Sequence, residues 1–334
     1  MTNLGKPVVR AAVVQAAPVL FDTPATLSKL EELVGEAAKQ KADIAVFPEA
    51  FVGGYPKGLD FGARLGSRSA EGREAFRLYF ESAIVVPGPE CARIGAAARE
   101  AGMHLVVGII ERDGGTLYCT ALTFGPDGSL LGKHRKLMPT ALERIVWGQG
   151  DGSTLAVADT SIGKIGSVIC WENYMPLLRM AMYAQGVQIY CAPTVDDRET
   201  WLPTMRTIAL EGRCFVVSAC QYLTREGCPP SYEGLLQNEL PSVLIRGGSC
   251  IIDPLGNVLL APEFEGPSVR VAELDMAAIA RGKYDLDVVG HYARPDIFRL
   301  TVDTAAKAAV AFEVPGLVPN GRRARPPSPK CQSF

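Results

Sequence analysis

Apolar runs of strand length alternate with amphipathic helical segments along most of this chain, and this alternation limits its fold more than any other feature of the sequence. Residues 8–16 (VVRAAVVQA) have the pattern of a buried strand, and residues 42–50 (ADIAVFPEA) contain a second one. Between them, residues 22–41 carry apolar side chains at helical spacing behind a capping residue, Asp22 or Thr23. Strand, helix and strand in this order predict a βαβ-like opening.

The alternation continues to a strand-like run at residues 268–274, and each half of the chain also contains a predicted hairpin. One hairpin turns at Pro126-Asp127-Gly128 and the other at residues 253–256 (DPLG). This pattern predicts two similar sheets with helices outside them, although the two halves are too dissimilar to be called a repeat. Residues 1–312 are therefore predicted to form one domain, and the Pro- and Arg-rich residues 313–334 a disordered tail.

Composition excludes several classes of protein. With 48% apolar and 21% charged residues the chain is ordinary for a globular protein, and a net charge of −2 favours neither nucleic acid nor an anionic membrane as a partner. No apolar run approaches the roughly 20 residues of a membrane span, and the N-terminus lacks the pattern of a signal peptide. Nine cysteines without a framework predict reduced thiols in the cytoplasm, and no His/Cys spacing predicts a metal site.

Three predicted strand ends carry polar residues that an apolar core would not favour: Glu49 in VFPEAF, Lys136 in KHRKLMPT and Cys170 in VICWEN. A thiol is a weak nucleophile until it loses its proton, and a nearby carboxylate can accept that proton. A lysine adds a positive charge that stabilises negative charge on a substrate heteroatom. Singly, each residue also has an ordinary interpretation, as a core thiol, a turn carboxylate or a surface charge. Together they form a set suited to thiol attack on a C≡N or C=O carbon.

Several separated segments, in order, resemble the signature segments of the nitrilase superfamily of C–N hydrolases, and are most similar to its true nitrilase branch. They are FPEAF, GKHRKLMPT, WGQGDGS and ICWENYMP. The resemblance extends over about residues 8–300 and includes GHYARPDIFRL at residues 290–300. It implies an α/β fold of the superfamily's kind, a four-layer αββα sandwich, and an enzyme that needs neither a metal nor an organic cofactor.

The resemblance also implies a Glu-Lys-Cys triad, with Glu49 as the base, Lys136 as the cation and Cys170 as the nucleophile. A second glutamate of the family matches Glu143 in TALERIVWG, where it would hold the lysine or position water. The alternative for Glu143 is a charge on a helix face. This sequence does not depart from the family pattern at these four positions.

Four further residues near these motifs carry weaker expectations. Trp171, directly after the cysteine, is typical of nitrilases, whereas amidase-type relatives usually carry tyrosine there. Its backbone N–H is expected to donate to developing negative charge, and the alternative is a core aromatic. Glu172 is expected to be structural, because a second carboxylate would raise the pKa of the thiol. Tyr55 and Thr194 are expected to line the substrate pocket, with ordinary loop roles as the alternative.

The implied reaction is hydrolysis of a small-molecule organic nitrile to the carboxylic acid and ammonia, through a thioimidate and a thioester on Cys170. An amidase or a cyanide or nitrile hydratase-type relative is the nearest alternative, and a non-catalytic scaffold protein is a more distant one.

The family resemblance further implies a homo-oligomer, either a dimer or a longer spiral. Residues 290–300 would contribute to its interface, and the alternative for this segment is an ordinary C-terminal strand. Aliphatic, aromatic, arylacetic and cyano-amino-acid nitriles all remain open as substrates.

Overall fold

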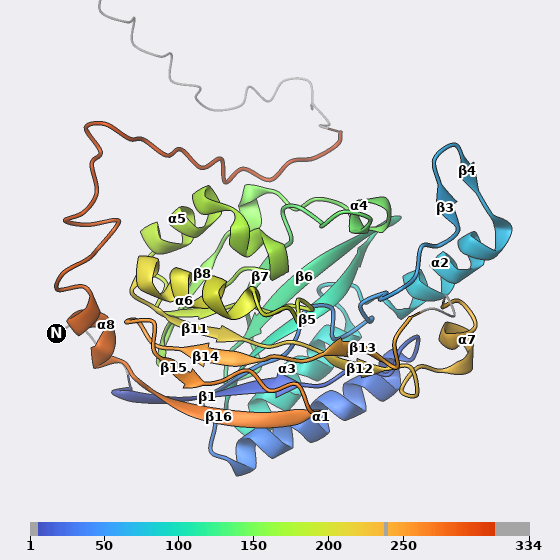
Figure 1. Cartoon of the computed structure of the whole chain (residues 1–334), viewed down its shortest axis with the longest axis horizontal. Coiled ribbons are helices and arrows are strands. Elements are labelled where there is room, and N and C mark those ends of the chain that lie inside the picture. The colour runs from blue at the N-terminus through green and yellow to red at the C-terminus, as the bar shows by residue number, and fades with distance from the viewer. Residues whose placement is uncertain (1–5, 237–239, 311–334) are drawn as a thin grey trace, which may run out of the picture.

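Two six-stranded sheets packed face to face form the centre of the protein in the computed structural model, which describes residues 6–236 and 240–310 (Figure 1). The first sheet has the order β16 (Ser268–Asp275), β1 (Val8–Gln15), β2 (Ile44–Val46), β5 (His104–Asp113), β6 (Thr116–Phe124) and β7 (Leu130–Arg135). The second has the order β15 (Val258–Leu260), β14 (Cys250–Ile252), β11 (Phe215–Ser218), β10 (Ile189–Cys191), β9 (Gly163–Ser167) and β8 (Val157–Thr160). The predicted pair of similar sheets is confirmed.

Helices cover the outer face of each sheet. They are α1 (Thr23–Lys39) and α3 (Pro89–Ala101) on the first sheet, and α5 (Pro176–Ala184) and α6 (Trp201–Gly212) on the second (Figure 1). The start of α1 is the predicted one, because the Asp22 side chain accepts a hydrogen bond from the N–H of Ala25 at 2.9 Å. The result is the predicted four-layer αββα sandwich.

Strand β1 shows how the apolar pattern produces these layers. Successive side chains of a strand point to opposite faces of its sheet. Val9, Ala11 and Val13 lie in the apolar layer between the two sheets, whereas Ala12 and Val14 pack in the layer beneath α1 and α3. Both faces of the strand are buried at residues 11–14, so this part of it is continuously apolar instead of alternating with polar residues.

The last strand crosses between the halves of the chain. After the hairpin of the second sheet, β16 pairs antiparallel with β1 in the first sheet, with Val8 opposite Asp275 and Gln15 opposite Ser268. The order of elements along the sequence does not reveal this pairing, because hydrophobic pattern specifies a strand but not its neighbour.

Several smaller elements complete the fold and were not predicted. They are two short hairpins, β3 (Ala63–Arg64) with β4 (Ser67–Arg68) and β12 (Tyr222–Thr224) with β13 (Val243–Arg246), and the helices α2 (Ala70–Ser82), α4 (Glu143–Val146), α7 (Pro230–Glu233) and α8 (Ala277–Gly282). Two 3₁₀ turns, η1 (Gly152–Thr154) and η2 (Cys170–Tyr174), accompany them. Of these elements, α4 and η2 carry candidate catalytic residues.

Residues 290–300 contain no strand, so the alternative of an ordinary C-terminal strand is wrong. Tyr292, Ile297 and Phe298 are exposed by 65%, 58% and 77%. The chain then contacts the body again where the Lys307 N–H donates to Asp151 Oδ2 at 2.7 Å. The predicted tail at 313–334 lies outside the described residues, and the domain boundary at 312 therefore stays a prediction. Within the described ranges, no helix is both long and apolar enough to cross a membrane.

Gly108, in the middle of β5, lies directly under the segment that carries Glu49. A Cβ atom at Gly108 would be 2.1 Å from the Pro48 carbonyl oxygen and 2.7 Å from the Glu49 Cα. Both neighbours belong to the backbone and cannot rotate away. A glycine inside a strand often marks such a close approach of two backbones.

Substitution of Gly108 by alanine is expected to displace Glu49 and to lower the free energy of unfolding by about 1–3 kcal/mol, the usual cost of overpacking. Urea unfolding and steady-state kinetics should both detect the change. Gly132 in β7 offers a matched control, because a Cβ there meets nothing within 4 Å. Equal behaviour of the two variants would show that the backbone around Glu49 tolerates the displacement.

Candidate active site

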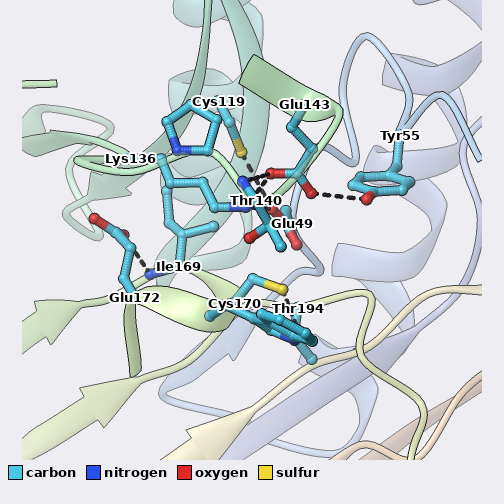
Figure 2. Close-up of polar contacts among 12 residues, drawn as sticks. Glu49, Tyr55, Cys119, Lys136, Thr140, Glu143, Ile169, Cys170, Glu172 and Thr194 are labelled. Carbon is cyan, nitrogen blue, oxygen red and sulfur yellow. Dashed lines mark hydrogen bonds and ion pairs between the residues drawn. The ribbon is translucent and has the colours of Figure 1, made fainter. Parts of the chain in front are cut away.

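The predicted catalytic residues converge at one end of the two sheets, and two of them follow inner strands at equivalent positions. Glu49 lies three residues beyond Val46, the end of β2, and Cys170 lies three residues beyond Ser167, the end of β9. The central strands of each sheet are parallel, and ligand sites of such sheets lie beyond their carboxyl ends. Lys136 directly follows β7, and Glu143 opens α4. Figure 2 shows all four side chains in one cluster.

Lys136 lies at the centre of this cluster. Its Nζ is 2.7 Å from Glu49 Oε1 and 2.8 Å from Glu143 Oε2, and the Lys136 and Glu49 side chains are both 0% exposed. A buried ammonium needs such partners, because burial without them strongly disfavours the charged form. Lys136 is therefore part of the buried cluster and not one of the surface charges of its basic segment.

Glu143 belongs to the cluster too and does not lie on a solvent-facing helix surface. Besides Lys136, its carboxylate accepts hydrogen bonds from the Tyr55 hydroxyl at 2.7 Å and from the Thr140 N–H at 2.6 Å. Burial, followed by the Glu143 charge, holds the pKa of Tyr55 well above its ordinary value, so this hydroxyl remains a donor. Tyr55 thus orients the second glutamate from the loop after β2.

Cys170 begins the 3₁₀ turn η2 with a positive φ of 50°. Its N–H donates to the Pro193 carbonyl at 2.9 Å, and its carbonyl accepts from Asn173 Nδ2 at 2.8 Å. The Thr194 hydroxyl lies 3.3 Å from Cys170 Sγ and accepts from the Asp196 N–H at 2.9 Å, which leaves its own hydrogen for the sulfur. Thr194 therefore contacts the candidate nucleophile directly, and it is not among the residues that line the cavity described below.

The protonation states follow from burial and charge. Burial, with the nearby Glu49 carboxylate, raises the pKa of Cys170 well above that of an ordinary thiol, so the resting group is S–H. Burial also raises the pKa of Glu49, against the opposing effect of Lys136. For Lys136, burial lowers the pKa, but Glu49 and the other acidic groups around it outweigh that effect and raise it well above the ordinary value. A neutral thiol, a carboxylate of raised basicity and a fixed cation can perform base-assisted nucleophilic addition.

A cavity of about 180 Å³ opens above Cys170, lined by Tyr55, Lys57, Thr140, Glu143, Cys170, Trp171 and residues 195–198. Trp171 is 41% exposed, so its interpretation as a core aromatic is wrong. Its indole N–H donates to Asp196 Oδ2 at 2.8 Å, and the Arg198 guanidinium lies 4.6 Å from its ring centroid. Among the described residues none accepts a hydrogen bond from the Trp171 backbone N–H.

The sequence interpretation missed two residues that contact Glu49. Cys119, interpreted as a core thiol, donates from Sγ to Glu49 Oε1 at 3.5 Å, and Gln221 Nε2 donates to the Glu49 backbone oxygen at 2.8 Å. One signal could have identified Cys119. The turn of the first hairpin sets the register between β6 and β7, and this register brings the Lys136 N–H to the Cys119 carbonyl at 2.8 Å. Gln221 follows a different sheet, and no local pattern indicates its contact.

Glu172 has the structural role that was expected. Its carboxylate accepts from the N–H of Leu137 at 2.6 Å and from the N–H of Ile169 at 3.0 Å, and His134 Nε2 lies 3.0 Å away. Leu137 follows Lys136, and Ile169 precedes Cys170. One buried side chain therefore joins the two segments that carry the cation and the thiol. Figure 2 includes the contact with Ile169.

Glu172→Gln replaces one of these acceptor oxygens by an amide that faces N–H donors. We expect kcat to fall by about 10- to 100-fold, because a hydrogen bond to a charged group contributes about 1.5–3 kcal/mol, while KM changes little. Steady-state kinetics and urea unfolding should be compared with those of Glu36→Gln, a change at an exposed position of α1. A folded Glu172→Gln variant with normal kcat would show that this link does not control the position of Cys170.

Within the described residues no cluster of three or more His, Cys, Asp or Glu side chains is arranged to hold a metal ion.

Comparison with known proteins identifies the family of the chain. The sequence profile of the carbon–nitrogen hydrolase family matches residues 10–284. An aliphatic nitrilase of Sinorhizobium fredii (strain HH103) is 58% identical over 301 residues, which cover 90% of this chain and 97% of the relative. A bifunctional nitrilase/nitrile hydratase, NIT4A of Lupinus angustifolius, is 56% identical over 316 residues, covering 93% of this chain and 90% of the relative.

A solved structure shares the fold at lower sequence identity. Saccharomyces cerevisiae Nit3, a member of branch 10 of the nitrilase superfamily, superposes with a TM-score of 0.67 at 24% identity, and the match covers 86% of this chain and 97% of Nit3. The family match spans most of the chain, and the relatives above 50% identity cover it almost fully. This chain therefore belongs to the carbon–nitrogen hydrolase family and, within the nitrilase superfamily, to the nitrilase branch that its motifs predicted.

Proposed function

We propose that this protein hydrolyses an organic nitrile to the carboxylic acid and ammonia, with Cys170 as the nucleophile. The observation that carries this proposal is the convergence of Cys170, Glu49, Lys136 and Glu143 beneath one cavity. The names of the relatives from Sinorhizobium fredii and Lupinus angustifolius support nitriles as the substrate class.

In the first half of the reaction, Glu49 accepts the Cys170 proton as the sulfur adds to the nitrile carbon. Because the pKa values of both groups are raised by burial, the proton moves only when the thiol attacks, and no free thiolate accumulates. The nitrile nitrogen gains negative charge and takes up the proton that Glu49 received, which gives a thioimidate and returns Glu49 to the carboxylate form. The Lys136 ammonium and the Trp171 backbone N–H stabilise that charge.

In the second half, Glu49 activates a water that adds to the thioimidate carbon. Release of ammonia from the tetrahedral carbon leaves a thioester, and a second water releases the acid and restores the thiol. Nitrogen departs only as a protonated amine. A carboxylate favours that state whereas a neighbouring ammonium disfavours it, so Glu143 is the side chain that we assign to this step.

Amide release is the second candidate outcome, because the Lupinus angustifolius relative is named a bifunctional nitrilase/nitrile hydratase. Expulsion of sulfur instead of nitrogen from the same tetrahedral carbon would give the amide. The two outcomes share every earlier step and differ only in which bond breaks.

We expect mainly acid and ammonia from the wild-type protein, and a higher amide fraction from Glu143→Gln. The glutamine keeps the size of the side chain but loses the charge that holds the leaving nitrogen positive. A panel of aliphatic, aromatic, arylacetic and cyano-amino-acid nitriles, scored by ammonia release and chromatography, tests the proposal and finds the substrate class. Amide as the dominant wild-type product would favour a hydratase, and turnover of amides alone would favour an amidase.

We also propose that the protein is a cytoplasmic homo-oligomer. The exposed aromatic and apolar side chains of residues 290–300 support an interface between copies, because the cores of such interfaces are enriched in these residue types. The eight cysteines within the described ranges are all free, which suits a reducing compartment. Light scattering that found only a species near the 35.7 kDa chain mass would contradict self-assembly, and cell fractionation tests the compartment.

A further inference from the structure

The two carboxylate oxygens of Glu49 have different surroundings. Oε1 accepts hydrogen bonds from Lys136 Nζ at 2.7 Å and from Cys119 Sγ at 3.5 Å. Oε2 is buried and has no hydrogen-bond partner among the described residues. A buried carboxylate oxygen without a partner is costly, so such an atom in a folded protein calls for an explanation.

Chemistry alone does not distinguish the two oxygens, because a carboxylate can turn about its last bond and exchange them. Two donors on one side fix the plane of the carboxylate, so that whichever oxygen they hold, the other oxygen occupies the position that has no donor. The donors come from adjacent strand positions: Lys136 directly follows β7, and its backbone N–H is bonded to the Cys119 carbonyl on β6 at 2.8 Å. The sheet therefore fixes the positions of both donors relative to each other.

We propose that Cys119 is a positioning residue, whose thiol holds Glu49 Oε1 and thereby leaves Oε2 as the oxygen that takes the Cys170 proton and later activates water. This inference rests on the proposed function, in which Glu49 is the base. Cys119 itself forms no bond with the substrate. The Cys119 S–H bond stays intact throughout, and the proton that Glu49 takes from Cys170 passes on to the nitrile nitrogen.

A thiol suits this task better than a hydroxyl would. Burial, followed by the Glu49 charge, raises the pKa of Cys119 well above its ordinary value, so it remains a donor at any working pH. A thiol is also a weaker donor than a hydroxyl, so it orients the carboxylate while drawing off less of its basicity than a hydroxyl would. A hydroxyl at the same place would bind Oε1 more strongly and make Glu49 a weaker base.

The test is the pH dependence of kcat/KM in Cys119→Ala, Cys119→Val and Cys119→Ser. The acid limb is the fall in kcat/KM at low pH, where Glu49 becomes protonated. Loss of a donor disfavours the carboxylate form of Glu49, so this limb should move to higher pH by roughly one unit in the Ala and Val variants. At a pH below that limb, kcat/KM should fall about tenfold. The serine variant retains a donor, and its limb should lie at or below that of the wild type. Cys250→Ala, at a buried thiol of β14, is the matched control and should leave the limb in place.

A second measurement does not depend on nitrile turnover. The rate at which iodoacetamide alkylates Cys170 can be followed against pH by mass spectrometry, because tryptic digestion places Cys119 in residues 113–133 and Cys170 in residues 165–179. The same upward shift is expected in the donor-free variants. If the proposed function fails, no nitrile is consumed although the alkylation shift persists.

The inference is overturned if the alanine, valine and serine variants share one acid limb, or if all of them keep that of the wild type. Should the donor-free variants not fold, Cys119→Ser decides alone. A limb at lower pH supports the contact, and a limb at higher pH contradicts it.

Discussion

Cys170→Ala is expected to abolish turnover and leave the protein folded. Removal of the nucleophile from an enzyme that acts through a covalent intermediate typically costs about 10⁴-fold or more in kcat. The substitution removes a single sulfur atom from a position whose backbone bonds, to Pro193 and Asn173, do not involve the side chain. The free energy of unfolding should therefore change by about 1 kcal/mol or less.

Ammonia release with any nitrile that the wild type consumes is the measurement, and urea unfolding reports the fold. Mass spectrometry of rapidly quenched wild-type protein should find an acyl adduct on the tryptic peptide of residues 165–179. Cys250→Ala removes another buried thiol, distant in sequence, and should retain full activity. Substantial turnover by Cys170→Ala would mean that a different residue attacks the substrate.

Lys136→Arg should be nearly as damaging as removal of the side chain. The Lys136 ammonium is 0% exposed, is held between Glu49 and Glu143, and lies 5.4 Å from the Trp147 ring centroid. A planar guanidinium is larger and directs its donors in a different geometry. We expect a loss of about 3 kcal/mol in transition-state stabilisation, or roughly 100-fold in kcat, which is the scale of losing an oxyanion donor.

Lys133→Arg is the matched control, because Lys133 lies on β7, the strand that Lys136 directly follows, and pairs with Glu111 while its side chain is 27% exposed. Steady-state kinetics of both variants, with thermal unfolding as a check on the fold, make the comparison. Near-normal kcat in a folded Lys136→Arg variant would contradict the assignment of Lys136 as the stabilising cation. A large loss in both variants would point to disruption of the strand instead.

Some features of the site follow from local sequence. Glu49 and Cys170 were predicted at strand ends, and the structure places both three residues past their strands. A run of apolar residues that stops at a polar residue is a local signal. It locates the polar residue at the end of a strand because the two are only a few residues apart in the chain. The four signature segments identified the same residues by resemblance, and the family that they indicated is the one whose profile matches the chain.

Other features of the site were missed, because each of them is a contact between distant segments. Cys119 and Glu49 are 70 residues apart, and Gln221 and Glu49 are 172 apart. A cysteine in an apolar strand looks the same whether its sulfur meets a leucine or a carboxylate. Trp171 shows the same limit, since its motif was recognised but its place at the cavity mouth depends on Asp196 and Arg198.

The sequence by itself determined the main strands and helices of the two sheets and their covering layers, and the chemical identity of the candidate catalytic set. Hydrophobic period, helix caps and turn residues act over a few neighbours in the chain. Only the tertiary structure decided which strands pair and which donors surround each reactive atom. It placed β16 beside β1, the Thr194 hydroxyl on the Cys170 sulfur and the Cys119 thiol on one oxygen of Glu49. These contacts depend on how the two sheets and their loops pack in space. A local sequence pattern does not encode the distance between segments that are far apart in the chain.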